Sequence, residues 1–185
     1  MFLKSLATCA VVMSSISVAV GNDRVYFYGV DFTEARAYAV TESPAKFATA
    51  FDGINVLLIQ EPDKYDFSNV VGALTETVLA PVMQKNSECS FSSLITTVRA
   101  VEPFDYAGAV ADYDLPQTEG RGLIIFARLL DKAGQTAVYD VVLFDIATRE
   151  VLGYKQCATR AGGFGLRNYW ANSVYGLTKT LRFAR

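Results

Sequence analysis

The spacing of apolar residues predicts two long amphipathic helices. In the first, apolar side chains recur every three or four positions after the start signal Ser43-Pro44, at Phe47, Phe51, Ile54 and Leu58. Pro62 is expected to end this helix, because proline disfavours helical geometry in the residue before it. A second stripe of the same kind lies near the C-terminus, at Leu166, Trp170, Val174, Leu177 and Leu181.

Runs of β-branched and aromatic residues predict the strands. The clearest are three consecutive runs joined by short turns, at 123–130, 137–144 and 150–159, and connections this short require antiparallel neighbours. Weaker runs predict further strands at 24–30, 35–40, 77–83 and 107–111, and Pro81 indicates an edge position for the third of these. The expected fold class is α+β: an antiparallel or mixed sheet of about five strands with two main helices packed on it.

The first residues carry an export signal. Lys4 precedes an apolar run that extends to Val20, and Ala19-Val20-Gly21 has the small residues that a signal peptidase recognises. We therefore expect residues 1–21 to be removed near Gly21 and residues 22–185 to form a single globular domain in the periplasm or outside the cell. No other apolar run approaches bilayer-spanning length, so no transmembrane segment is expected after cleavage.

Composition excludes several functional classes. The chain has no histidine, which removes histidine-based catalytic triads, histidine-ligated metals and the usual general base at neutral pH. After removal of residues 1–21, sixteen Lys and Arg face nineteen Asp and Glu, and they form no basic run. Neither nucleic acid nor an anionic membrane surface is therefore an expected partner. No cofactor, metal site or complete set of catalytic residues is predicted.

A glycine-rich turn between the last strand and the last helix is a candidate anion site. It contains Gly162, Gly163 and Gly165 between Arg160 and Arg167. Glycines let the main chain approach a ligand, a helix N-terminus presents unpaired N–H groups, and two arginines could bind phosphate, sulfate or carboxylate. A strand-to-helix reversal needs such glycines even without a ligand, so both interpretations stay open.

An acidic and aromatic stretch at 102–119 is a candidate loop for a ligand or partner. Its candidate residues are Asp105, Tyr106, Asp112, Tyr113 and Asp114. Carboxylates beside tyrosines can hold sugars, and two carboxylates in one concave pocket would permit glycoside hydrolysis. No calcium-loop spacing is present, and a solvated acidic loop explains the same residues.

Two cysteines remain once Cys9 is removed with the signal peptide. Cys89 and Cys157 form an even pair that would meet an oxidising compartment. A disulfide between them and two separate buried thiols are equally compatible with the sequence, because spacing does not establish proximity.

Three tracts carry a resemblance to a known group of proteins. They are residues 142–152 (VLFDIATREVL), 162–171 (GGFGLRNYWA) and 61–66 (EPDKYD). With them the chain resembles a family of uncharacterised secreted proteins from Gram-negative gut bacteria, a family that implies export but no activity. The order of three antiparallel strands and a closing helix is also similar to accessory domains of envelope lipoproteins, at the level of fold alone.

The sequence therefore favours an exported, non-enzymatic domain that binds a partner protein or an envelope component. One alternative is a carboxylate-based hydrolase acting on glycan or peptidoglycan. Another is a module that binds a small anion at the turn between Gly162 and Arg167. The oligomeric state is not determined by any of these observations.

Overall fold

The computed structural model describes residues 24–183, so the predicted signal peptide and its cleavage near Gly21 lie outside the described residues. The helices are α1 (Pro44–Gln60), α2 (Ser68–Val71), α3 (Ala80–Glu88), α4 (Tyr106–Ala111) and α5 (Leu166–Thr180). The strands are β1 (Val25–Asp31), β2 (Arg36–Tyr38), β3 (Thr75–Thr77), β4 (Ile95–Thr96), β5 (Arg121–Asp131), β6 (Thr136–Asp145) and β7 (Val151–Arg160). None of the described helices is both long and apolar enough to cross a membrane.

Five of the strands follow a path of parallel pairs in the order β3-β1-β5-β2-β4. The predicted α+β class, with an antiparallel or mixed sheet of about five strands and two main helices, is therefore wrong: within residues 24–183, five helices accompany the sheet in an α/β-type fold. The error has a physical cause. Parallel partners such as β1 and β5 are far apart in the chain, with helices and other strands between them, and no local turn signal reports such a pairing.

The C-terminal strands pair as the short turns predicted. β6 pairs antiparallel with β5, and β7 pairs antiparallel with β6. The two predicted long helices are also confirmed as α1 and α5. The predicted strand at 77–83 is wrong, because Pro81 lies in the first turn of α3, where its missing N–H costs no helical bond. The predicted strand at 107–111 is helical too, with the Asp105 carboxylate accepting from the Gly108 N–H.

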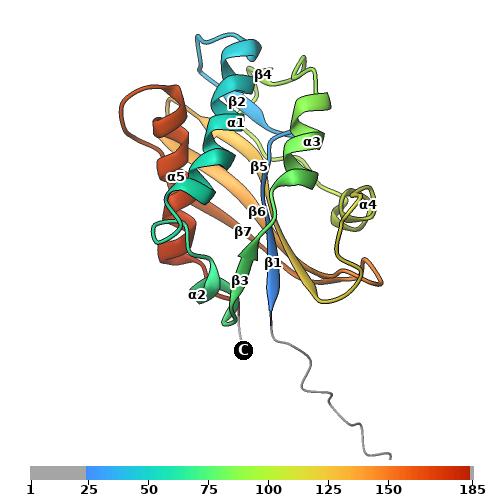
Figure 1. Ribbon diagram of the computed structural model, residues 1–185. Coiled ribbons are helices and arrows are strands. Elements are labelled where there is room, and N and C mark those ends of the chain that lie inside the picture. Colours follow the sequence, from blue (N-terminus) through green and yellow to red (C-terminus); the bar gives the residue numbers. More distant parts are fainter. Residues whose placement is uncertain (1–23, 184–185) are drawn as a thin grey trace, which may run out of the picture.

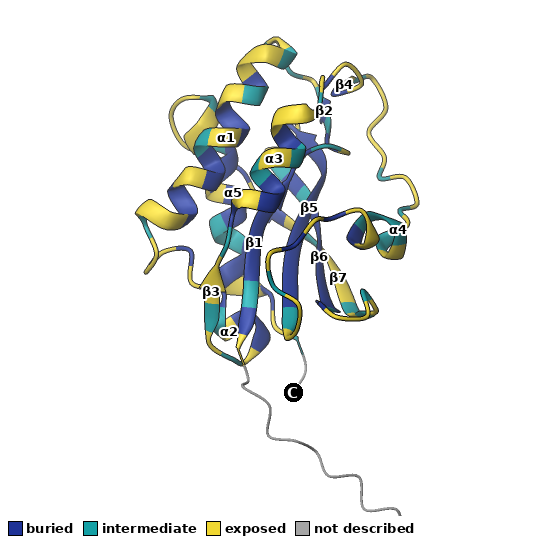
Figure 2. Cartoon of the chain, turned by 45° about the vertical axis from the view of Figure 1, so that its right-hand side comes forward, coloured by how far each residue is buried: buried dark blue, intermediate teal, exposed yellow. Residues whose placement is uncertain are grey.

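Helices cover both faces of the sheet (Figure 1). On one face, α1, α2 and α5 pack on β1, β5 and β6 in the larger apolar core, which contains the fully buried Trp170. On the other face, α4 and the segment after it cover a smaller core that includes Tyr28, Phe126 and Phe144. Figure 2 shows the consequence: β1 and β5 are buried along most of their length, and β7 is largely exposed.

Beside the bulge of β1 at Gly29, two asparagine side chains form the hydrogen bonds of the Val30 main chain. The register of β1 against β5 shifts between Phe27 and Val30, and Gly29 has a φ of 101°. Asn55 of α1 accepts from the Val30 N–H at 2.8 Å and donates to the Val30 carbonyl at 2.9 Å. Asn86 of α3 donates to the same carbonyl at 3.0 Å. These buried side chains therefore tie both helices to the end of β1.

Candidate functional site

The loop between β7 and α5 has a fixed main chain. The Ala161 N–H donates to the Gln135 carbonyl at 2.8 Å, and the Gly162 N–H donates to the Tyr169 carbonyl at 3.0 Å. Gly163 and Gly165 have φ values of 118° and 79°, a region that other residues rarely adopt. The glycines therefore serve the reversal of the chain, as one of the two sequence interpretations holds. Between Gly163 and Gly165, the loop presents the side chain of Phe164 to solvent.

Phe164 is the most exposed large apolar side chain of the described residues, with 94% of its surface open to solvent. Most other phenylalanines of the chain are buried in the two cores. We refer to residues 161–167 as the glycine loop, and Phe164 lies at its centre. Cavities lie around it, and three of them share residues of the loop.

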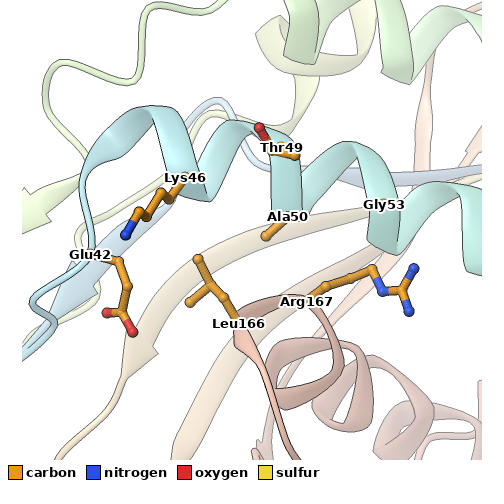
Figure 3. A pocket seen from close by; sticks show the side chains of 7 residues that line it. All are labelled: Glu42, Lys46, Thr49, Ala50, Gly53, Leu166 and Arg167. Carbon is orange, nitrogen blue, oxygen red and sulfur yellow. The ribbon is translucent and has the colours of Figure 1, made fainter.

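The largest of these cavities is a groove of about 650 Å³ between α1 and the start of α5. Figure 3 shows Ala50 and Leu166 facing each other across it, with Glu42 and Lys46 at one end and Arg167 at the other. Gly53 allows Arg167 to lie against α1, because a Cβ at this position would come within 2.7 Å of the arginine Cδ. The groove is therefore apolar inside and charged at its ends.

The predicted arginine pair does not converge on one site. Arg167 lines a cavity of about 360 Å³ together with Gly162, Gly163 and Lys64. Arg160 lines a different cavity of about 370 Å³, with Gln135 and Tyr169, and the two glycines border both. The cation that accompanies Arg167 is thus Lys64, which sequence reasoning missed because it follows α1, about 100 residues earlier in the chain.

Lys64 carries its own counter-ion. Its ammonium group donates to Glu61 at 2.7 Å, and this hydrogen bond raises the pKa of Lys64 above its ordinary value. The lysine is therefore charged at neutral pH, but part of its charge is compensated locally. Asn168 and Asn172 of α5 line the same cavity and add amide groups.

The acidic stretch does not form one binding surface. Asp105 caps α4, Asp112 and Asp114 are exposed, and the Asp112 carboxylate lies 3.7 Å from the Lys85 ammonium. Tyr113 is a core residue that donates to the buried Asp31 carboxylate, and burial raises its pKa. Tyr106 stacks on Tyr154 of β7. The sequence could not separate these roles, because all five residues lie in one stretch of like composition.

The buried carboxylates of the described residues are all engaged. Asp31 accepts from Thr33 and Tyr113, Asp131 from Gly134 and Arg99, and Asp140 from Arg128 and Gln156, so each of the three has a structural role. Within residues 24–183 no group of three or more acidic or cysteine side chains could hold a metal ion.

Two exposed carboxylates do share a cavity. Asp63 and Asp66 line a polar hollow of about 340 Å³ with Ser68, Thr75 and Thr77. Asp66 already accepts from the Ser68 N–H at 2.8 Å.

The two cysteines are free thiols in the structure. The Cys89 thiol lies 3.9 Å from the Thr33 carbonyl. Cys157 lies in β7, where its main chain is opposite Tyr139 of β6. Burial raises the pKa of the Cys157 thiol, which makes it a weaker nucleophile at neutral pH. The two thiols are thus separate, as one of the two sequence alternatives holds, but they are half-buried rather than buried.

Comparison of the chain with models of protein families, with curated proteins and with solved structures found no match.

Proposed function

We propose that this protein is an exported, non-enzymatic binding module, released by cleavage near Gly21 into the periplasm or beyond the cell. It recognises a partner protein through the face formed by the glycine loop and the groove beside it. The proposal is supported by the signal sequence, by the missing histidines and by the structural roles of the buried carboxylates. It depends most on one observation, the exposure of Phe164.

An aromatic ring held in water by a fixed loop is unfavourable unless a partner covers it. Burying a phenylalanine side chain contributes about 1.5–3 kcal/mol. The chain forgoes this contribution at Phe164, although an apolar groove that includes Leu166 lies two residues away. Because main-chain hydrogen bonds at Ala161, Gly162 and Gly165 hold the loop on both sides of Phe164, little conformational entropy is lost when a partner binds. These are properties of the aromatic anchors found at the centres of interfaces.

The charges around the loop define the partner further. Basic residues outnumber acidic ones around the two cavities: the three cations are Lys46, Lys64 and Arg167, and the two anions are Glu42 and Glu61. This local excess is opposite to the net charge of the chain. A partner that presents an apolar side chain to the groove and acidic groups around it fits this face.

The test is a Phe164→Ser variant. We expect its affinity for the partner captured from native envelope extract to fall about 30-fold or more, since truncating a central aromatic anchor costs about 2 kcal/mol or more. Thermal unfolding should stay unchanged, because the ring contributes no packing in the free protein.

A matched control is Leu74→Ser, which removes another exposed apolar side chain, 75% open to solvent, beside β3. This variant should capture the partner like the unaltered protein. Equal capture by the Phe164 variant, with folding intact, would contradict the proposed site.

A small anion at the glycine loop is the second candidate, favoured by the cavity that Lys64 and Arg167 share with Gly162 and Gly163. If phosphate binds there with a dissociation constant near 0.1 mM, 10 mM phosphate should stabilise the protein by about 2.7 kcal/mol. Thermal unfolding in phosphate and in chloride of equal ionic strength measures this. An unchanged midpoint, or a shift that persists in Arg167→Ala, rules the anion site out.

A further inference from the structure

The outer side of β7 is an unoccupied edge of the sheet. Within residues 24–183, β7 pairs only with β6, although it is ten residues long. Its regular pairing with β6 runs from Gly153 to Arg160, and a bulge at Leu152 precedes it. An edge of this length presents a row of unpaired N–H and C=O groups that can accept another strand.

The opposite side of the sheet lacks such an edge. There the outermost strands are β3 and β4, with three and two residues. Short edge strands, prolines and bulges are the usual protection against unwanted pairing. β7 contains no proline, and its bulge lies at its start rather than in its centre. The sheet is thus protected on one side and open on the other.

The charges of β7 select what can pair with it. Lys155 and Arg160 are exposed, and the strand has no acidic residue. Lys155 donates to the Arg182 carbonyl at 2.6 Å, a contact that leaves its charge uncompensated. No acidic side chain pairs with Arg160 among the described residues. A strand that places carboxylates opposite these two cations would be stabilised.

The two faces of β7 differ. Lys155 and Cys157 lie on the face covered by α5. Tyr154 lies on the opposite face, where it stacks on Tyr106 with ring centroids 4.1 Å apart and stays 54% exposed. A side chain opposite Tyr154 would therefore meet an aromatic surface, and one opposite Lys155 a cation. The preferred partner therefore places an acidic residue opposite Lys155, an apolar residue opposite Tyr154 and a second acidic residue opposite Arg160.

We infer that β7 is a docking edge for an extended acidic segment of a partner protein, which adds a strand to the seven-stranded sheet. This surface adjoins the glycine loop at Arg160, but its strand pairing does not use Phe164, so it can bind or fail to bind independently of that residue. Self-pairing of two copies is disfavoured, because β7 supplies cations and no carboxylate to its own partner strand.

The test uses a synthetic peptide, Glu-Thr-Val-Thr-Thr-Glu-Val-Thr, added to the isotope-labelled mature protein. In the antiparallel register its glutamates lie opposite Arg160 and Lys155, and its valines opposite Ala158 and Tyr154. We expect amide NMR shifts concentrated in β7, and protection from hydrogen exchange at its outward N–H groups. A peptide with lysine in place of both glutamates should bind about tenfold more weakly.

A charge-reversed variant, Lys155→Glu with Arg160→Glu, should invert this preference while the unfolding midpoint stays near that of the unaltered protein. The inference is overturned if the two peptides bind equally, if neither binds, or if the shifts lie away from β7. Sedimentation showing that the protein already dimerises through β7 would also overturn it. The same peptide should bind the Phe164→Ser variant unchanged, so failure here leaves the proposed function standing.

Discussion

Replacing Asp140 with alanine is expected to lower the free energy of unfolding by about 3–5 kcal/mol. Arg128 and Asp140 form a salt bridge at 2.9 Å, with side chains 6% and 0% exposed. Without the carboxylate, the guanidinium stays buried with an uncompensated charge, and its Nε already has no partner among the described atoms. For a chain of this size, thermal unfolding should shift down by roughly 10 °C, which calorimetry can measure.

The fold itself positions this ion pair. Arg128 is the extra residue where the pairing of β5 with β6 shifts between Ala127 and Leu129. Such a bulge reorients side chains, and here it directs Arg128 toward Asp140 on the neighbouring strand. The Phe104 ring covers the Arg128 guanidinium, whose Cζ lies 4.1 Å from the ring centroid. Arg128 donates a further hydrogen bond to the Glu102 carbonyl. Burial and then the nearby Asp140 carboxylate raise the pKa of Tyr106 to about 12, so this neighbour stays neutral.

The control is the double variant Arg128→Met with Asp140→Leu. Replacing both partners with apolar residues removes the uncompensated charge, so we expect a stability close to that of the unaltered protein or above it. A double variant as unstable as Asp140→Ala alone would show that lost packing, and not the unpaired arginine, causes the effect.

Replacing Asn55 with alanine is expected to lower the free energy of unfolding by about 2–3 kcal/mol. The side chain satisfies both main-chain groups of Val30 at the bulge of β1. Its loss leaves the Val30 N–H buried without an acceptor, while Asn86 still donates to the Val30 carbonyl. Each unsatisfied buried group costs about 1–3 kcal/mol, and the vacated space adds to this.

Hydrogen exchange at the Val30 amide measures the loss of this hydrogen bond directly. The Val30 amide should exchange much faster in Asn55→Ala than in the unaltered protein, beyond the change of global stability. Val56→Ala is a suitable control, because this neighbouring side chain on α1 is 36% exposed and bonds to nothing in β1. It should change stability by about 0.5 kcal/mol or less. An unchanged Val30 exchange rate in Asn55→Ala would contradict the role assigned to Asn55.

The candidate site was located in part by sequence. Three glycines between a strand and a helix marked the loop, and the structure has a loop between β7 and α5 at this position. Phe164 itself was a readable signal, since an apolar residue flanked by glycines in a turn serves neither a strand nor a helical stripe. Lys46, Gly53 and Lys64 were missed, because only the packing of α1 against α5 brings them to the loop.

The sequence by itself determined the local elements with strong periodicity. Helical stripes and short turns act within a few residues, so α1, α5 and the order β5-β6-β7 could be read directly. The tertiary structure alone decided the parallel pairing of β1 with β3 and β5, the use of Asn55 and Asn86, and the grouping of charges at the glycine loop. Such contacts join segments 25 to 100 residues apart, and their energies depend on which surfaces meet when the whole chain folds.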